Sequence, residues 1–217
     1  MVVFHFSFDL NNFHVVALDL KHGEFWRYFR FVIVSMFVFS SGISLILAHK
    51  EKIHFHKVKK RVLILAGASL LVSIGSYTQF PNTWIYFGIL HFFLFASVAG
   101  LFFLKIPKIA FIVGVVIIAG YNFHFLSMHW LYLLLQEPLH LPLRYTEDLA
   151  NIVPWFGVFL LGMSFAKFNF HEKVFNNLFF NQKTVINKSF SFLGKHSLLI
   201  YLLHQPILFG IFLFLKS

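Results

Sequence analysis

Six apolar stretches of 15 to 20 residues, separated by short polar segments, constrain this chain more than any other feature. A helix needs about 20 apolar residues to cross the hydrocarbon core of a bilayer, and fewer when polar residues at its ends reach the interface. A composition of 59% hydrophobic and 12% charged residues is also too apolar for a soluble domain. The sequence therefore predicts an all-α, polytopic integral membrane helical bundle with six full transmembrane helices. These are expected near residues 31–48, 62–77, 85–104, 109–126, 152–166 and 198–215.

Basic residues are concentrated in every second connection. The segments 49–61, 105–108 and 167–195 together hold 13 of the 18 Lys and Arg residues. Because cytoplasmic loops carry an excess of Lys and Arg, we expect these three loops in the cytoplasm and a multi-pass protein of the bacterial inner membrane. The formal net charge of +10 is explained by this placement, so we expect no binding to nucleic acid.

The first residues, MVVFHFSF, are apolar but too short to span a membrane. The charge alternation requires the chain to reach Leu10 from the cytoplasmic side. Residues 1–8 are then the outer half of a partial N-terminal helix, and we expect the chain to begin inside a longer gene product. The alternative is a first segment that lies at the membrane interface. In either case we expect residues 1–217 to form a single transmembrane domain, with a short interfacial helix inside the loop 127–151.

Two ionisable residues in the first segment are candidates for catalysis. His5 and Asp9 are four residues apart, and so lie on one face of a helix. The Asp9 carboxylate could accept a hydrogen bond from one imidazole nitrogen of His5 and fix its tautomer, which would leave the other nitrogen free as a base. The alternative is a polar pair at a helix end.

Further polar residues lie inside the predicted spans. His91 lies in the outer third of the span 85–104, where a packing role and a role in lining a substrate channel are both open. In the span 198–215, a polar stripe runs along one helix face beside a proline, Pro206, that frees a backbone carbonyl. Such a stripe can line a cavity or join helices. Its members are Ser197, Tyr201, His204 and Gln205.

No cofactor or metal site is expected. The chain has no cysteine, which excludes disulfides and thiolate chemistry. Its 13 histidines do not cluster in a pattern typical of metal ligands. From the residues alone, an enzyme and a non-catalytic membrane protein both remain open, the latter including a small proton-coupled transporter whose histidines relay protons.

Several segments resemble, in order, the bacterial branch of the heparan-alpha-glucosaminide N-acetyltransferase catalytic-domain family, within a wider group of transmembrane acyltransferases. The resemblance extends over essentially the whole chain. It is carried by FHFSFDL, FVFSSGISL with the basic loop that follows it, IYFGILHF, NIVPWFGVFLLGM and LGKHSLLIYLLHQP.

This resemblance implies a membrane acyltransferase that uses acetyl-CoA or another acyl-CoA as co-substrate. Better-studied members move an acetyl group from cytosolic acetyl-CoA to an amino sugar across the membrane. A histidine acts there as general base or as transient acyl carrier. On this basis His5 is the expected catalytic residue and Asp9 orients it, while His91 and His204 line the acceptor or acyl channel.

The same resemblance sets further expectations. In the family, an Arg-Gly pair typically precedes the histidine by about three turns of the first helix. Met1 falls inside that helix here, which agrees with a start inside a longer product. We expect membrane lipids, acyl-CoA and a cell-envelope glycan or lipid acceptor as partners. The oligomeric state is open, with a homo-oligomer among the options.

Overall fold

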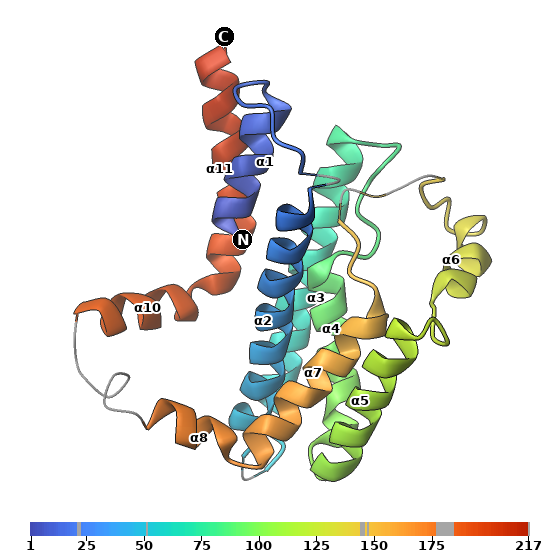
Figure 1. Cartoon of the computed structure of the whole chain (residues 1–217), viewed down its shortest axis with the longest axis vertical. Coiled ribbons are helices and arrows are strands. Elements are labelled where there is room, and N and C mark those ends of the chain that lie inside the picture. Colours follow the sequence, from blue (N-terminus) through green and yellow to red (C-terminus); the bar gives the residue numbers. More distant parts are fainter. Residues whose placement is uncertain (21–22, 51, 144–145, 147, 177–184, 217) are drawn as a thin grey trace. The chain divides into compact units, whose positions relative to one another are not determined.

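The computed structural model describes residues 1–20, 23–50, 52–143, 146, 148–176 and 185–216. Throughout these ranges the regular structure is helical, which confirms the all-α prediction (Figure 1). The chain divides into two compact units: Met1–Val34 with Glu172–Ser217, and Ser35–His171. We call them the terminal unit and the central unit and describe each by itself.

The terminal unit is built around α1 (Val2–Asn12) and α11 (Ser197–Lys216), which lie side by side (Figure 1). The partial helix predicted at 1–8 is therefore helical and continues to Asn12. The first turns of α2 (Glu24–Ala48) and the helix α10 (Val185–Lys195) also belong to this unit. Phenylalanines join α1 to α11: Phe6 lies 5.8 Å from Phe212, and Phe13 stacks on the same ring at 5.2 Å.

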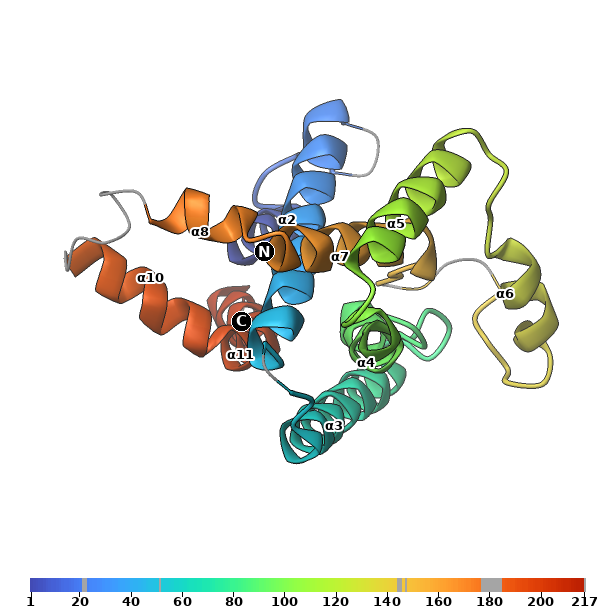
Figure 2. The same cartoon turned by 90° about the horizontal axis from the view of Figure 1, so that it is seen from below.

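The central unit contains the rest of α2 and most of the other helices. α3 packs beside α4, and α5 packs beside α7, as Figures 1 and 2 both show. The short helix α6 confirms that a helix lies inside the loop 127–151. The remaining bounds are α3 (Phe55–Gln79), α4 (Ile89–Ala99), the 3-10 turn η1 (Gly100–Phe103), α5 (Pro107–Asn122), α6 (His129–Gln136) and α7 (Ile152–Lys167).

Successive long helices of the central unit run in opposite directions (Figure 1). The connections after α2, before α5 and after α7 therefore lie at one end, and lysines lie in or beside all three: Lys50, Lys52, Lys105, Lys108 and Lys167. We call this the basic end. It agrees with the predicted alternation, although residue 51 and residues 177–184 of the predicted basic loops lie outside the described residues. The helix α8 (Phe170–Phe175) follows α7 and was not predicted.

Within the central unit, the backbones of α2 and α7 approach each other closely at two glycines. A Cβ placed on Gly42 of α2 would overlap the Phe159 carbonyl, and one on Gly162 of α7 would overlap the Phe39 carbonyl. The two backbones approach this closely only because both positions are glycine. The largest fully buried apolar side chains here are Phe92, Phe159, Leu45, Leu160, Met163 and Val38.

Three helices, not six, are long and apolar enough to span a membrane by length and composition: α2, α3 and Ser197–Leu215 of α11. The other three apolar helices in the described residues, Ile89–Phe103, Pro107–Asn122 and Ile152–Lys167, are shorter. A helix of 16 residues is about 24 Å long, less than the roughly 30 Å of hydrocarbon. The prediction of six full spans is wrong to that extent, because part of the apolar sequence at 85–88 and 123–126 lies in loops.

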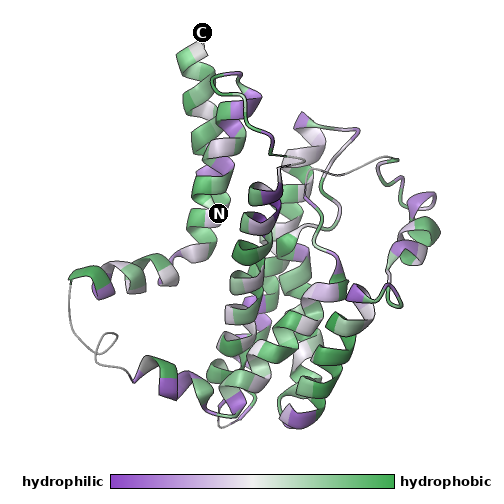
Figure 3. Cartoon of the chain, viewed as in Figure 1, coloured by the Kyte–Doolittle hydropathy of each residue, from purple (hydrophilic) through white to green (hydrophobic). Residues whose placement is uncertain are grey.

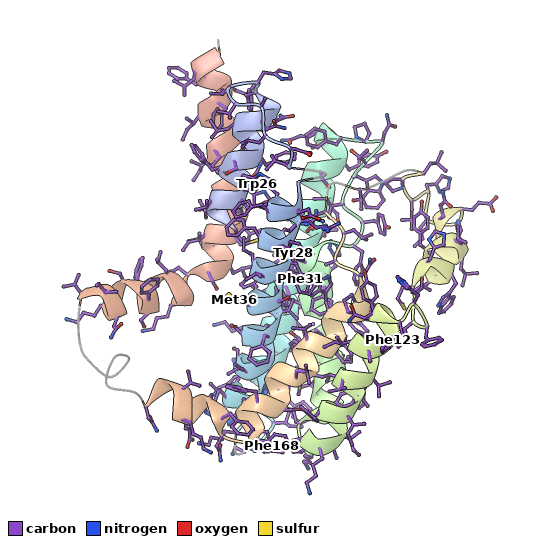
Figure 4. All side chains as sticks on the ribbon, viewed as in Figure 1. Trp26, Tyr28, Phe31, Met36, Phe123 and Phe168 are labelled. Atoms are coloured by element: carbon purple, nitrogen blue, oxygen red, sulfur yellow. The ribbon has the colours of Figure 1, made fainter. Side chains whose placement is uncertain are left out.

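Large apolar side chains cover the outer surfaces of these helices. Apolar residues predominate along α5 and α7 in Figure 3. On α2, Phe31 and Met36 are 52% and 66% exposed, and both are labelled in Figure 4. Exposed apolar surface along whole helices is typical of proteins that contact lipid. The structure therefore supports a membrane protein.

Candidate active site

The candidate site lies in the terminal unit, where one face of α1 meets the polar stripe of α11. The two helices run in the same direction. Residues further along α1 contact residues further along α11: His5 contacts His204, and Phe13 contacts Phe209. Phe4, next to His5, packs edge-on against Trp26 at 6.1 Å (Trp26 is labelled in Figure 4). An aromatic pair therefore lies next to His5.

His5 and His204 are neighbours across this contact. Their ring centroids are 4.9 Å apart and the rings are inclined at 61°. His204 is buried, at 9% exposure, and His5 is half-buried. Two imidazoles from opposite ends of the sequence are thus brought together, as the interpretation of both as site residues requires.

The backbone of α11 fixes the protonation of His204. Its Nδ1 lies 2.7 Å from the Tyr201 carbonyl and 3.1 Å from the Ile200 carbonyl. A nitrogen that faces only acceptors must carry the proton, so the lone pair of the neutral ring is on Nε2. Nε2 is buried and has no hydrogen-bond partner among the described residues. His204 therefore presents a basic nitrogen inside the helix pair.

Asp9 is bonded to a residue other than the one we expected. Its Oδ1 accepts a hydrogen bond from Gln205 Nε2 at 3.0 Å, and the side chain is fully buried. The hydrogen bonds found in the described residues do not include one between Asp9 and His5, although the two share a helix face. The expected orientation of His5 by Asp9 is thus not present: interhelical pairing with Gln205 replaces it.

Two further atoms of this cluster are buried without a partner in the described residues. They are Asp9 Oδ2 and Gln205 Oε1. Buried polar atoms are normally hydrogen-bonded, so unpaired ones mark a place where a polar ligand group would gain bonds. Beside them, the Tyr201 ring lies 5.8 Å from His204. Ser197 differs: it is exposed at the first residue of α11, and the structure gives it no contact with the cluster.

His91 belongs to the central unit and is part of a different network. Its Nδ1 accepts the Gly88 N–H at 3.2 Å, so Nε2 carries the proton and donates to Ser73 Oγ at 3.1 Å. The Ser73 hydroxyl in turn donates to the Ile85 carbonyl at 2.7 Å. Both ring nitrogens are engaged in capping α4 and joining it to α3. These contacts correspond to the structural alternative for His91; its role in lining a channel stays a prediction.

Sequence reasoning missed the residues that complete this network. Asp148, from the loop before α7, accepts the Ile89 N–H at 3.1 Å and so caps the same helix end. Thr146 donates to the Trp84 carbonyl at 2.7 Å. Their partners are about 60 positions away, and no local pattern reveals such a pairing. The serines of α3 gave a partial signal through their helical spacing.

The terminal unit brings imidazole, carboxyl and amide groups together among apolar side chains. In the described ranges, no group of three or more His, Asp or Glu side chains is placed to hold a metal ion. Imidazole serves there as a base or as a nucleophile.

Comparison with known proteins identifies the family. A search of curated proteins and a search of solved structures gave no match. The family model described as "Heparan-alpha-glucosaminide N-acetyltransferase, catalytic" matches residues 1–206, which include α1, the His5 and His204 pair and Gln205. The match covers nearly the whole chain, and on this basis the chain belongs to the heparan-alpha-glucosaminide N-acetyltransferase catalytic-domain family.

Proposed function

We propose that this protein is a membrane acetyltransferase that takes the acetyl group of cytosolic acetyl-CoA and transfers it to an amino sugar or another cell-envelope acceptor on the opposite face. The family implies the acetyltransferase class. The observation that carries the assignment of the site is the pairing of His5 with His204 at 4.9 Å. On this proposal the basic end of the central unit faces the cytoplasm, where the donor is supplied.

The reaction needs a group that removes a proton from the acceptor as it attacks the thioester. His5 takes the proton from the acceptor amine or hydroxyl while that atom bonds to the carbonyl carbon, and CoA leaves as its thiolate. The proton then passes to Nε2 of His204, whose lone pair has no partner among the described residues. Asp9 and Gln205 hold α1 against α11 and so keep the two rings together.

The test measures the release of CoA by the full chain, with any upstream residues included, in lipid nanodiscs. A thiol reagent detects the CoA, and residues 1–217 add no thiol background because they contain no cysteine. We expect His5→Ala to lower the rate by roughly 100-fold or more, the usual loss when a general base is removed. His56→Ala, at an exposed position of α3, is the matched control and should keep full activity. Absence of turnover in the wild type would refute the proposal.

The same nanodisc samples distinguish a general-base role of His5 from a role as acyl carrier. Protein denatured rapidly at neutral pH, where an acetyl-imidazole survives longer than in acid, is examined for bound label after exposure to radiolabelled acetyl-CoA without acceptor. A carrier histidine would retain acetyl on its ring, and His5→Ala would abolish the label. A general base leaves the protein unlabelled while turnover with acceptor continues.

A further inference from the structure

A cavity of ≈ 250 Å³ opens at the basic end of the central unit, where α2 and α7 both end. Ile46 and Ala166 supply part of its apolar wall. Its polar lining is Lys50, Lys167, Asn169 and His171. The reaction proposed above does not use these residues. We call this cavity the basic pocket.

Two lysines line the basic pocket. Each helix C-terminus contributes a partial negative charge of about one half, and two such ends meet here. Lys50 and Lys167 each bring an ammonium group to the pocket. None of the described residues that line the pocket is acidic. Two lysines in the lining favour an anionic ligand.

His171 supplies a second, independent indication. Its side chain is only 8% exposed, and its Nδ1 is buried without a hydrogen-bond partner in the part of the chain that the structure describes. A buried ring nitrogen of this kind can donate its proton to an anionic oxygen. Asn169 has a positive φ of 59° and turns the chain after α7. Asn169 and His171 both line the pocket.

The size of the pocket limits what it can hold. Sites for drug-sized molecules measure about 300–1,000 Å³, so a cavity of ≈ 250 Å³ accommodates a headgroup-sized anion and not a whole nucleotide carrier. Phosphate combines the required charge with several strong acceptor oxygens. Basic pockets between membrane helices on the cytoplasmic side are known to hold lipid headgroups.

We propose that the basic pocket binds a phosphate group at the membrane interface through Lys50, Lys167 and His171. Its size favours the headgroup of an anionic phospholipid as the source. The 3′-phosphate of CoA has the same chemistry and is the other source that the experiment distinguishes. The inference stands apart from the proposed reaction, because a structural lipid would occupy the pocket whether or not the protein transfers acetyl groups.

The test places the full chain in nanodiscs with equal amounts of phosphatidylglycerol and phosphatidylcholine and measures, by native mass spectrometry, which lipid stays bound. We expect phosphatidylglycerol to be enriched on the wild type. The double variant Lys50→Gln with Lys167→Gln should lower that enrichment by at least about fivefold. This is the loss in affinity expected when a single lysine near an anionic membrane surface is removed. Lys105→Gln with Lys108→Gln removes two charges at the same end outside the pocket and should leave it unchanged.

A second measurement identifies the source of the phosphate. Thermal unfolding in phosphatidylcholine nanodiscs is compared with CoA and with 3′-dephospho-CoA. If CoA raises the unfolding temperature, 3′-dephospho-CoA does not, and the Lys50 and Lys167 double variant loses the effect, then the phosphate belongs to the nucleotide. No enrichment and no CoA-specific shift in the wild type, or effects that persist in that variant, would overturn the proposal. If the double variant does not fold, the two single Gln variants, each expected to show part of the loss, decide the outcome.

Discussion

At the scale of single residues, two of the histidines singled out from the sequence, His91 and His204, are bonded differently. Both nitrogens of His91 have partners, so the ring has no lone pair to offer a substrate. His204 uses only Nδ1, on two carbonyls of its own helix, and its Nε2 stays available. A catalytic base needs a free lone pair, so this difference favours His204 over His91 as a residue of the site.

The bond between Asp9 and Gln205 gives a testable coupling. Gln205→Leu leaves the buried Asp9 carboxyl with neither oxygen bonded in the described residues, which should destabilise the protein by about 1–3 kcal/mol. Asp9→Leu in turn leaves the Gln205 amide without its partner. The double variant should lose less stability than the sum of the two, with a coupling of about 0.6 to 1.7 kcal/mol between membrane-helix side chains.

Reversible unfolding in detergent micelles measures the free energies of this cycle. The control cycle combines Asp9→Leu with Ser197→Ala, since Ser197 is exposed and lies two turns before His204 on α11. That pair should show no coupling. Additive effects for Asp9 and Gln205 would contradict the hydrogen bond.

The sequence singled out four residues that the structure brings together, but it did not reveal their pairing. Helical spacing placed His5 with Asp9, and His204 with Gln205, on common faces. A carboxylate can pair along its own helix or across to another, and local spacing does not decide between these. The contact between α1 and α11 does: Asp9 bonds Gln205, and His5 meets His204.

At the scale of helices, glycine determines how closely α2 approaches α7. Gly42→Ala or Gly162→Ala would push a methyl group into the carbonyl of Phe159 or Phe39. Each should destabilise the protein by about 1–3 kcal/mol, the usual cost of overpacking. Thermal unfolding of the purified variants checks this.

Two glycines of α3 are matched controls for this prediction. A Cβ at Gly67 or Gly75 would meet nothing within 4 Å. Gly67→Ala and Gly75→Ala should therefore be neutral or stabilise the helix by about 0.5–1 kcal/mol, because alanine loses less backbone entropy. Equal destabilisation at all four positions would show that the close approach of α2 and α7 is not what sets the cost.

Helix existence was predictable from the apolar stretches, whereas several helix ends were not. The stretch predicted as 85–104 begins as a helix only at Ile89, where Gly88, His91 and Asp148 form its cap. The stretch 109–126 instead starts earlier, at Pro107, and ends at Asn122. Hydropathy does not distinguish an apolar loop from an apolar helix, so these limits depend on caps made partly by distant residues.

At the scale of the whole molecule, the predicted membrane orientation remains to be measured. Alternating helix directions in the central unit place Lys57 and Lys105 at its basic end, and Asn82 and Glu137 in connections at the other. All four side chains are exposed. The excess of Lys and Arg at the basic end predicts that this end is cytoplasmic.

Cysteine labelling tests this orientation without a background signal, because the chain has no cysteine of its own. In intact bacterial spheroplasts, a membrane-impermeant maleimide should label Asn82→Cys and Glu137→Cys at once. Lys57→Cys and Lys105→Cys should react only after permeabilisation, since the bilayer separates them from the reagent. The reverse pattern would place the basic end outside, and the proposed donor would then have to reach the site from the other face. Labelling of all four from one side would contradict the alternation itself and show that α3 and α5 do not cross the membrane.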